Sequence, residues 1–434
     1  MLFKDISLID QDCTIHHNQY VGVKDNLIDY IGIQMPKQPG LYGQEYDGKG
    51  KLLMPGFFNA HAHTPMVLMR GYGENLSLQD WLNTRIFPFE NKLQGNDIYW
   101  ATLLGIAEML KFGTVSATDM YFFGEDMAKA ILKSGMKFNL SMGTTCFDDR
   151  ELIDLAIFQE AKALFADYHG ARDGKLLIDL SIHAEYTSNP NIVRGISDYC
   201  KKIGSRMHVH ISETLSEHEQ CKQRHNGQTP VQYFESLGVF DNPSTAAHCV
   251  WVEDGDREIL ARHGVTVATC PISNLKLASG VCDIPKLLQA GVNVAIGTDS
   301  AASNNNLDMV EEMKFFALLT KGKYYDPTLI MPKQTIYAAT AAGAKSQGRT
   351  MSGSIKVGNC ADLIVINLNT PHLQPVHDLA NQIVYAANGS DVVLTMVDGK
   401  VLYQNGEYLT IDIEKVLFEV EKSKNRILAE LASR

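Results

Sequence analysis

The sequence lacks a surplus of positive charge. Its 39 lysines and arginines are outnumbered by 50 aspartates and glutamates, which gives a formal net charge of −11 at pH 7. A polynucleotide partner requires basic surface to offset the repulsion between phosphates, so this balance argues against nucleic-acid binding. A small-molecule substrate is the better expectation.

Long hydrophobic runs are also absent. No uncharged apolar stretch reaches the length of a membrane span, and residues 1–12 carry charges from the fourth position onward, unlike a secretory signal. The eight cysteines form neither a CxxC pair nor a regular framework, as expected of reduced thiols. We therefore expect a cytoplasmic protein with no membrane partner.

Several common site motifs are missing as well. No GxGxxG follows a predicted strand, and neither GxxxxGK[ST] nor GxSxG occurs, which argues against dinucleotide binding, nucleoside-triphosphate binding and a serine-hydrolase elbow. His183-Ala-Glu185 matches the HxE of the zinc cytidine and adenine base deaminases. Their PCxxC partner is absent, so that fold is rejected.

What the sequence does contain, from about residue 96 to 345, is a repeated alternation of a β-rich run, a turn and a helical pattern. This alternation predicts parallel strands joined by crossover helices, an α/β class. Eight such units fit a (β/α)₈ TIM barrel. The predicted strands are 54–59, 114–119, 137–143, 176–183, 206–212, 245–250, 265–270 and 292–298. Helical patterns include 99–112, 151–168, 256–263 and 308–319.

The two ends of the chain depart from this pattern. Short β-rich runs at 2–9, 27–33, 362–367 and 392–397 are separated by turn signals such as Asp398-Gly399 and Asn405-Gly406. We predict that residues 1–53 and 354–434 together form a small composite β-sandwich domain, which ends in a helix over 413–431. Residues 54–353 would then be the catalytic barrel.

Candidate metal ligands cluster at the predicted strand ends. His61 and His63 lie two residues apart at the end of the first barrel strand, so both side chains can face one ion. His183, His210, His248 and Asp299 each fall at the carboxyl end of another predicted strand, the edge where TIM barrels carry their active sites. Each histidine alone could be a structural residue; together they favour a metal site. Spacing does not distinguish His208 from His210, which share a strand face.

The segments HAHTP, HVHISET, AHCVW, PISNLKLASG and GTDSAASNNN resemble the amidohydrolase superfamily. Within it they are most similar to the branch that contains 5-methylthioadenosine/S-adenosylhomocysteine deaminases and triazine hydrolases. The resemblance covers nearly the whole chain. It implies that His61, His63, His210 and Asp299 bind one divalent metal ion, most simply Zn²⁺, and that Glu213 and His248 are catalytic.

The residue types are consistent with hydrolysis. Three imidazoles and a carboxylate leave one coordination position for water, whose pKa then falls toward neutrality. Asp299 can accept the water proton and later deliver it to departing ammonia, and Glu213 can protonate a ring nitrogen. His248 would position the attacking oxygen.

The resemblance also implies substrate contacts. Glu90 would hold the ribose hydroxyls, His183 the purine and Arg150 the substrate tail; Glu213 would contact the purine as it protonates it. For Glu90 and Arg150 the alternative is a solvated surface charge. A second tail-binding arginine of this branch is replaced at or near Met142, which favours the uncharged tail of 5-methylthioadenosine over the carboxylate of S-adenosylhomocysteine.

The resulting hypothesis is a metal-dependent deaminase of 5-methylthioadenosine, S-adenosylhomocysteine or both, and possibly adenosine, that releases the inosine analogue and ammonia. The alternatives are a related hydrolase of guanine, a triazine or another heterocycle, and a non-catalytic binding protein that kept the barrel. A non-catalytic protein would be expected to lose ligands, and all four are present. The sequence leaves the preferred substrate, the native metal and a homo-oligomeric state open.

Overall fold

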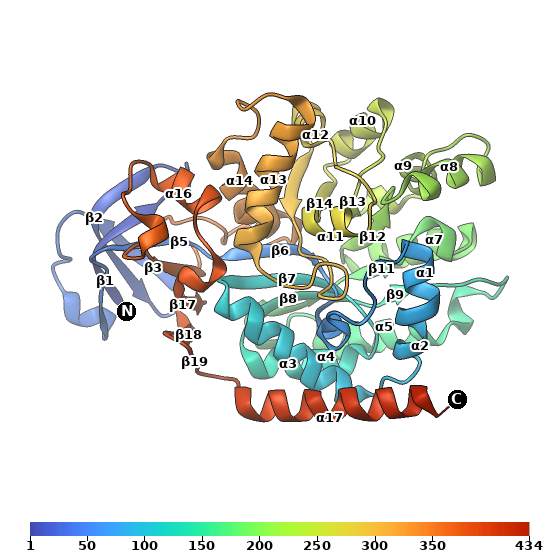
Figure 1. Ribbon diagram of the computed structural model, residues 1–434, viewed down its shortest axis with the longest axis horizontal. Coiled ribbons are helices and arrows are strands. Elements are labelled where there is room, and N and C mark those ends of the chain that lie inside the picture. Colours follow the sequence, from blue (N-terminus) through green and yellow to red (C-terminus); the bar gives the residue numbers. More distant parts are fainter. Residues whose placement is uncertain (434) are drawn as a thin grey trace.

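The computed structural model describes residues 1–433 and contains two kinds of β-structure (Figure 1). A mixed, mainly antiparallel sheet lies at one end of the molecule, and two wholly parallel sheets lie beside it, surrounded by helices. The α/β class with parallel strands that the sequence predicts is therefore confirmed.

The mixed sheet combines strands from both ends of the chain. Its hydrogen-bonded order is β19-β18-β17-β16-β5-β1-β2-β3, with β4 paired to β1. The strands are β1 (Leu2–Ile9), β2 (Ile15–Lys24), β3 (Leu27–Gly32), β4 (Glu45–Asp47), β5 (Lys51–Pro55), β16 (Leu363–Asn367), β17 (Val392–Val397), β18 (Lys400–Gln404) and β19 (Glu407–Tyr408). That residues 1–53 and 354–434 form a separate β-sandwich domain stays a prediction, and residue 434 lies outside the described part.

Both faces of this sheet are buried at β16. On β16, Leu363 and Val365 join a core cluster within the mixed sheet, whereas Ile364 and Ile366 pack into the larger core of the parallel sheets. Alternate residues of a strand face opposite sides, so this single strand contributes to two cores. The mixed sheet is thus packed directly against the part of the chain that carries the candidate site.

The parallel strands form two sheets, in the orders β10-β8-β7-β6 and β15-β14-β13-β12-β11-β9. The sheets meet where β8 is followed by β9 and β10 by β11, with one residue between the strands of each pair. The strands are β6 (Phe57–Ala62), β7 (Thr114–Met120), β8 (Lys137–Ser141), β9 (Gly143–Thr144), β10 (Leu176–Ile178), β11 (Leu180–Ile182), β12 (Met207–Ile211), β13 (Ser244–His248), β14 (Thr266–Thr269) and β15 (Asn293–Ile296).

The first predicted barrel strand, 54–59, requires correction. The structure divides it into the end of β5, in the mixed sheet, and the beginning of β6, in a parallel sheet. The division falls at Gly56, whose amide donates to the Asp362 carbonyl and where an added Cβ would lie 2.2 Å from the Val115 side chain. A continuous run of apolar residues conceals this change of sheet.

Helices connect the parallel strands and cover them (Figure 1). The longer ones are α3 (Gly95–Lys111), α4 (Gly124–Ser134), α5 (Ala156–Tyr168), α7 (Pro190–Ile203), α8 (Leu215–Arg224), α9 (Pro230–Ser236), α10 (Asp254–Arg262), α13 (Met309–Tyr324), α14 (Pro332–Ala339), α16 (Leu379–Tyr385) and α17 (Ile413–Ala432). The shorter ones are α1 (Leu78–Trp81), α2 (Phe87–Glu90), α6 (Ala171–Gly174), α11 (Pro271–Lys276), α12 (Ile284–Gln289) and α15 (Ala341–Ser346).

The terminal helix α17 agrees with the predicted range 413–431 and runs along α3 (Figure 1). Asp412 caps its amino end by accepting the Lys415 amide, Ile427 is fully buried, and Arg426 pairs with Asp97 in the first turn of α3. Across residues 1–433, no helix combines the length and apolar character needed to cross a bilayer.

Candidate metal centre and cavity

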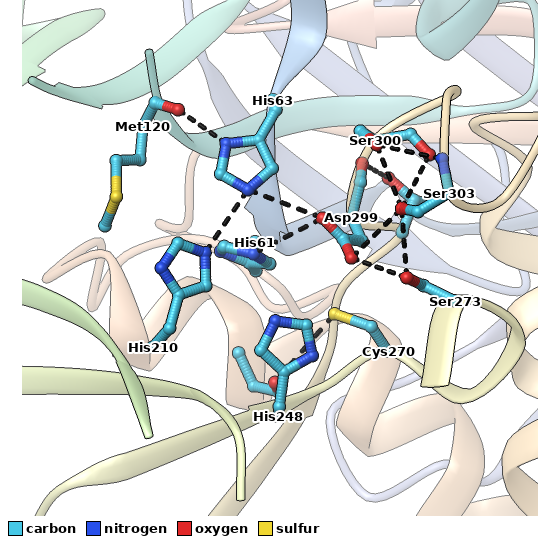
Figure 2. Close-up of polar contacts among 12 residues, drawn as sticks. His61, His63, Met120, His210, His248, Cys270, Ser273, Asp299, Ser300 and Ser303 are labelled. Atoms are coloured by element: carbon cyan, nitrogen blue, oxygen red, sulfur yellow. Dashed lines mark hydrogen bonds and ion pairs between the residues drawn. The ribbon is translucent and has the colours of Figure 1, made fainter. Parts of the chain in front are cut away.

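Six polar side chains that the sequence singled out lie at the carboxyl ends of the parallel strands. His61 is on β6 and His63 just after it, His210 is on β12, His248 ends β13, and His183 and Asp299 follow β11 and β15. Because parallel strands all end at the same edge, these residues converge (Figure 2). Their placement agrees with the sequence prediction.

Hydrogen bonds fix the orientation of two of the imidazole rings. His63 Nδ1 lies 2.5 Å from the Met120 carbonyl oxygen, and His210 Nδ1 lies 2.7 Å from that of His183. A carbonyl can only accept, so both Nδ1 atoms carry the proton. Burial holds the pKa of His210 well below its usual value, which keeps this ring neutral and leaves its Nε2 as a lone pair.

The two Nε2 atoms of His63 and His210 face each other at 3.3 Å (Figure 2). A ring with its proton on Nδ1 carries a lone pair on Nε2 when it is neutral. In that form neither Nε2 can donate to the other, and two lone pairs point at the same space. A shared cation satisfies such an arrangement. Metal-binding histidines commonly have their other ring nitrogen bound to a carbonyl in this way.

His61 and Asp299 complete the group. His61 Nε2 is buried and has no hydrogen-bond partner within residues 1–433, and it lies 3.6 Å from Asp299 Oδ1. The same carboxylate oxygen is 3.4 Å from His63 Nε2. Burial lowers the pKa of His61 to about 3, so its ring is neutral. The donor set of three imidazole nitrogens and one carboxylate oxygen fits a divalent ion such as Zn²⁺.

Asp299 is held by two serines. Its Oδ2 accepts hydrogen bonds from Ser273 Oγ at 2.6 Å and Ser303 Oγ at 3.2 Å, which leaves Oδ1 turned toward the histidines (Figure 2). Burial acts to raise the pKa of Asp299, but the neighbouring imidazoles outweigh it and hold the pKa well below the usual range. The carboxylate is therefore ionised.

The structure separates His208 from His210. His208 Nε2 lies 2.9 Å from His61 Nδ1, on the side of that ring away from Asp299, so His208 is a partner of a candidate ligand.

His248 contacts neither His208 nor the paired Nε2 atoms of His63 and His210 by a hydrogen bond. Its Nδ1 is 2.9 Å from Asn274 Oδ1 and its Nε2 is 3.9 Å from Glu213 Oε2. His248, His61 and Asp299 also bring potential ligand atoms within 4.8 Å of one another.

Glu213 stands beside His248, and its Oε1 accepts a hydrogen bond from Ser279 Oγ at 3.2 Å. Burial raises the pKa of Glu213 above its ordinary value. A second carboxylate, Glu217, accepts the amides of Ser212 at 2.9 Å and Glu213 at 2.7 Å and thereby holds the turn after β12. Sequence reasoning missed Glu217; its place four residues beyond Glu213, in the first turn of α8, was the available signal.

These groups form one wall of a cavity with about 850 Å³ of empty volume, open mouth included. Its polar lining includes His63, Glu90, His183, His210, Glu213, Glu217, His248 and Asp299. Its apolar lining includes Met66, Leu78, Trp81, Leu82, Ile86, Phe87, Met120, Phe122 and Leu277.

Three of the predicted substrate contacts, Glu90, His183 and Glu213, line this cavity. Glu90, at the end of α2, accepts a hydrogen bond from the Tyr121 hydroxyl at 2.7 Å, and burial raises its pKa to about 7. His183 Nδ1 is buried without a hydrogen-bond partner among the described residues, and burial lowers the pKa of the ring to about 4. A solvated surface charge does not describe Glu90.

The structure does not bring Arg150 or Met142 to the cavity. Arg150 is exposed and forms an ion pair with Asp148 at 2.9 Å. Met142 lies between β8 and β9 and faces the helices, where it lines a separate pocket with Leu164. The expectation that Met142 shapes the tail pocket is wrong, because its neighbour Gly143 faces the cavity and adjacent strand residues point to opposite sides.

Comparison with known proteins finds relatives along most of this chain. The amidohydrolase family profile matches residues 52–402. A 5-methylthioadenosine/S-adenosylhomocysteine deaminase of Dictyoglomus thermophilum is 42% identical over 378 residues, which is 87% of each chain. A 5′-deoxyadenosine deaminase of Methanosarcina acetivorans is 39% identical over 421 residues, 97% of this chain and 96% of the relative.

Solved structures agree at the level of the fold. An adenosine deaminase from Xanthomonas campestris with bound zinc is 29% identical and superposes with a TM-score of 0.91, covering 99% of this chain and 98% of its own. An atrazine chlorohydrolase from Arthrobacter aurescens in complex with zinc has a TM-score of 0.89 at 20% identity, covering 98% and 99%. At that identity the second likeness shows the fold alone.

Proposed function

Because this chain belongs to the amidohydrolase family and is a hydrolase that acts on carbon–nitrogen bonds, we propose that it deaminates 5′-substituted adenosines. Its substrates are 5-methylthioadenosine, S-adenosylhomocysteine or both, and adenosine, and its products are the inosine analogue and ammonia. The observation that carries the proposal is the convergence of four lone-pair donors, beside the buried acid Glu213, at the wall of a cavity lined by polar and apolar side chains.

One divalent ion per chain, Zn²⁺, would be held by His61, His63, His210 and Asp299. When bound, it supplies a Lewis acid that brings the pKa of water close to neutrality. The zinc in the similar adenosine deaminase structure supports this choice of metal.

The protein groups then carry out four proton transfers. Asp299, ionised and close to the attacking water, accepts its first proton as the oxygen bonds to C6 of the purine. Glu213, whose pKa burial raises, donates a proton to the adjacent ring nitrogen. Asp299 passes its proton to the amino group, the C6–N bond breaks and ammonia leaves, while the second water proton restores Glu213.

The neighbouring residues orient the reactants. His248 lies 3.9 Å from Glu213 and is positioned by Asn274, so it can hold the attacking oxygen in place. His183 offers an unpaired ring nitrogen to the purine, and Glu90 offers a carboxylate to the ribose hydroxyls. These assignments give His248, His183 and Glu90 a partner in the complex.

The tail pocket favours an uncharged 5′-substituent. Within residues 1–433, the cavity lining contains neither lysine nor arginine, so a homocysteine carboxylate would lose its hydration without an ionic partner. We therefore expect kcat/KM for 5-methylthioadenosine to equal or exceed that for S-adenosylhomocysteine. This expectation depends on the cavity lining and not on Met142, which lies outside it.

The parallel strands would close into an eight-stranded barrel, with β8 and β9 as one strand and β10 and β11 as another. Support comes from the parallel bridge between Ala62 and Asp299 and from the Asp299 amide, which donates to the His61 carbonyl at 3.0 Å. Both contacts join the first strand to the end of the last. Residues 54–353 would form this catalytic unit.

A substrate screen tests the proposal. Ammonia release by the zinc-loaded protein is measured with 5-methylthioadenosine, S-adenosylhomocysteine, adenosine and 5′-deoxyadenosine, and with guanine and atrazine as the alternative heterocycles. We expect turnover of the adenosines only. Turnover confined to guanine or atrazine, or a preference of tenfold or more for S-adenosylhomocysteine, would contradict the corresponding part of the proposal.

A further inference from the structure

Tyr121 is a cavity residue that none of the assignments above uses. It directly follows β7, its ring is 5% exposed, and its hydroxyl donates to Glu90 Oε1 at 2.7 Å. Its amide donates to the Ser141 carbonyl at 3.1 Å, so the backbone beneath the ring is tied to the end of β8. The hydroxyl thus connects Glu90 to the parallel sheet.

Glu90 needs such an anchor because of where it lies. It is the last residue of one continuous helical segment, in which α1 (Leu78–Trp81), a π-helical turn at Leu82–Ile86 and α2 follow one another without a break. A single helical segment of this length is only marginally stable by its own hydrogen bonds. Among residues 1–433, Tyr121 is the only hydrogen-bond partner of the Glu90 carboxylate.

The Glu90 carboxylate presents hydrogen-bond acceptors to the cavity. The Tyr121 hydroxyl donates to Oε1, which leaves Oε2 and the second lone pair of Oε1 as adjacent acceptors. Two adjacent acceptors match a ligand that offers two adjacent O–H donors. A vicinal diol is such a ligand, whereas a deoxy sugar leaves at least one acceptor unpaired at a cost.

We propose that Tyr121 is a positioning residue that fixes the Glu90 carboxylate for the ribose 2′,3′-diol and so makes the enzyme selective for ribonucleosides. This inference rests on the proposed function, because it assumes that the cavity binds adenosines. Tyr121 acts through Glu90 and takes no part in proton transfer at C6.

The test compares adenosine with 2′,3′-dideoxyadenosine in wild type, Tyr121→Phe, Glu90→Gln and the double variant. Phenylalanine keeps the ring and removes only the hydroxyl. We expect Tyr121→Phe to lower kcat/KM for adenosine by about tenfold or more, mainly through KM, as for loss of a hydrogen bond to a charged group. The change for the dideoxy substrate should be less than about twofold, and Tyr121→Phe should add no further loss to Glu90→Gln.

Tyr233→Phe is the matched control, because it removes a buried tyrosine hydroxyl that lies outside the cavity and lacks a hydrogen-bond partner in the described chain. It should leave the ratio between the two substrates unchanged. If circular dichroism shows that Tyr121→Phe is not folded, Tyr121→Met fills the space without a donor and should give the same diol-selective loss.

The outcomes are distinct. Equal losses on both substrates, or a further loss in the Glu90→Gln background, would overturn the role of Tyr121 while leaving the deaminase proposal intact. Absence of turnover of every adenosine by the wild-type protein would overturn the proposed function, and the inference with it.

Discussion

The Nδ1 atoms of His63 and His210 both donate to main-chain carbonyls, so the backbone itself sets which nitrogen of each ring faces the site. This arrangement explains why residue type and spacing predicted the candidate ligands. Spacing left open whether His208 or His210 is the candidate ligand, because only the three-dimensional structure shows which ring reaches the Nε2 atom of His63. The positions of Arg150 and Met142 outside the cavity could not be foreseen for the same reason, since a sequence does not report which way a loop or a strand interruption turns.

Removal of the metal should abolish activity, because no protein side chain in the site can replace the activated water. We expect about one divalent ion per chain, and His61→Ala and Asp299→Ala should each lose both the ion and turnover. Elemental analysis beside an activity assay checks this. His16→Ala, an exposed histidine on β2, should retain both; fully active protein without bound metal would contradict the assignment.

Glu213→Gln separates metal binding from proton transfer. Glutamine preserves size but cannot donate the proton, so the variant should keep the ion and lose about 10² to 10⁴-fold in kcat, the range for a positioned acid or base. Metal content and kcat are measured together. The exposed Glu45→Gln is the control, and a Glu213→Gln enzyme with normal turnover would show that another group supplies the proton.

At the scale of elements, the strands with clear alternation and the amphipathic helices were predicted within a few residues, and β1, β17 and α17 almost to the residue. Other features were not predicted, and two of them show why. The long strand β2 (Ile15–Lys24) begins with polar residues that hide its pattern, and the apolar run at 54–59 conceals the passage from β5 to β6. Hydrophobic periodicity indicates that a residue is buried, but it does not indicate in which sheet.

The interruption between β10 and β11 carries Asp179, which accepts hydrogen bonds from Asn139 Nδ2 at 3.0 and 3.1 Å. Burial raises its pKa to about 6, above the roughly 3.9 of an unfolded chain. Between these values the folded protein keeps a proton that the unfolded chain has lost. The free energy of unfolding therefore falls as pH rises through this window, by at most about 3 kcal/mol.

Asp179→Asn should remove this pH dependence. Relative to wild type, the variant should gain stability as pH rises from 4 to 7, as measured by urea unfolding at each pH. A constant difference between Asp179→Asn and wild type across this pH range would mean that burial does not raise the pKa of this carboxylate.

At the scale of the whole molecule, one buried cation joins the two β-structures. Lys137, at the start of β8, lies 2.6 Å from Asp362 and 2.6 Å from Asp398, which border β16 and β17 of the mixed sheet. Lys137→Met would leave two carboxylates without their shared partner in a buried region.

We expect Lys137→Met to lower the free energy of unfolding by about 3–5 kcal/mol, the usual loss when one partner of a buried ion pair is removed. Thermal or urea unfolding measures this. Lys4→Met breaks an exposed pair with Glu45 and should cost no more than about 1 kcal/mol. Similar small losses in both variants would show that the parts are held together by apolar packing alone.

The pairing of β5 with β16 has a consequence for synthesis on the ribosome. The two strands are separated by roughly three hundred residues, so β5 emerges long before its neighbour exists, and such distant pairings form slowly. A nascent chain that ends before residue 363 should be cleaved by protease within 45–55, and one that extends past residue 404 should be protected. Strand β6, which carries His61 and leads to His63, follows β5 directly. We therefore expect the candidate metal site to form only after the last part of the chain has been synthesised.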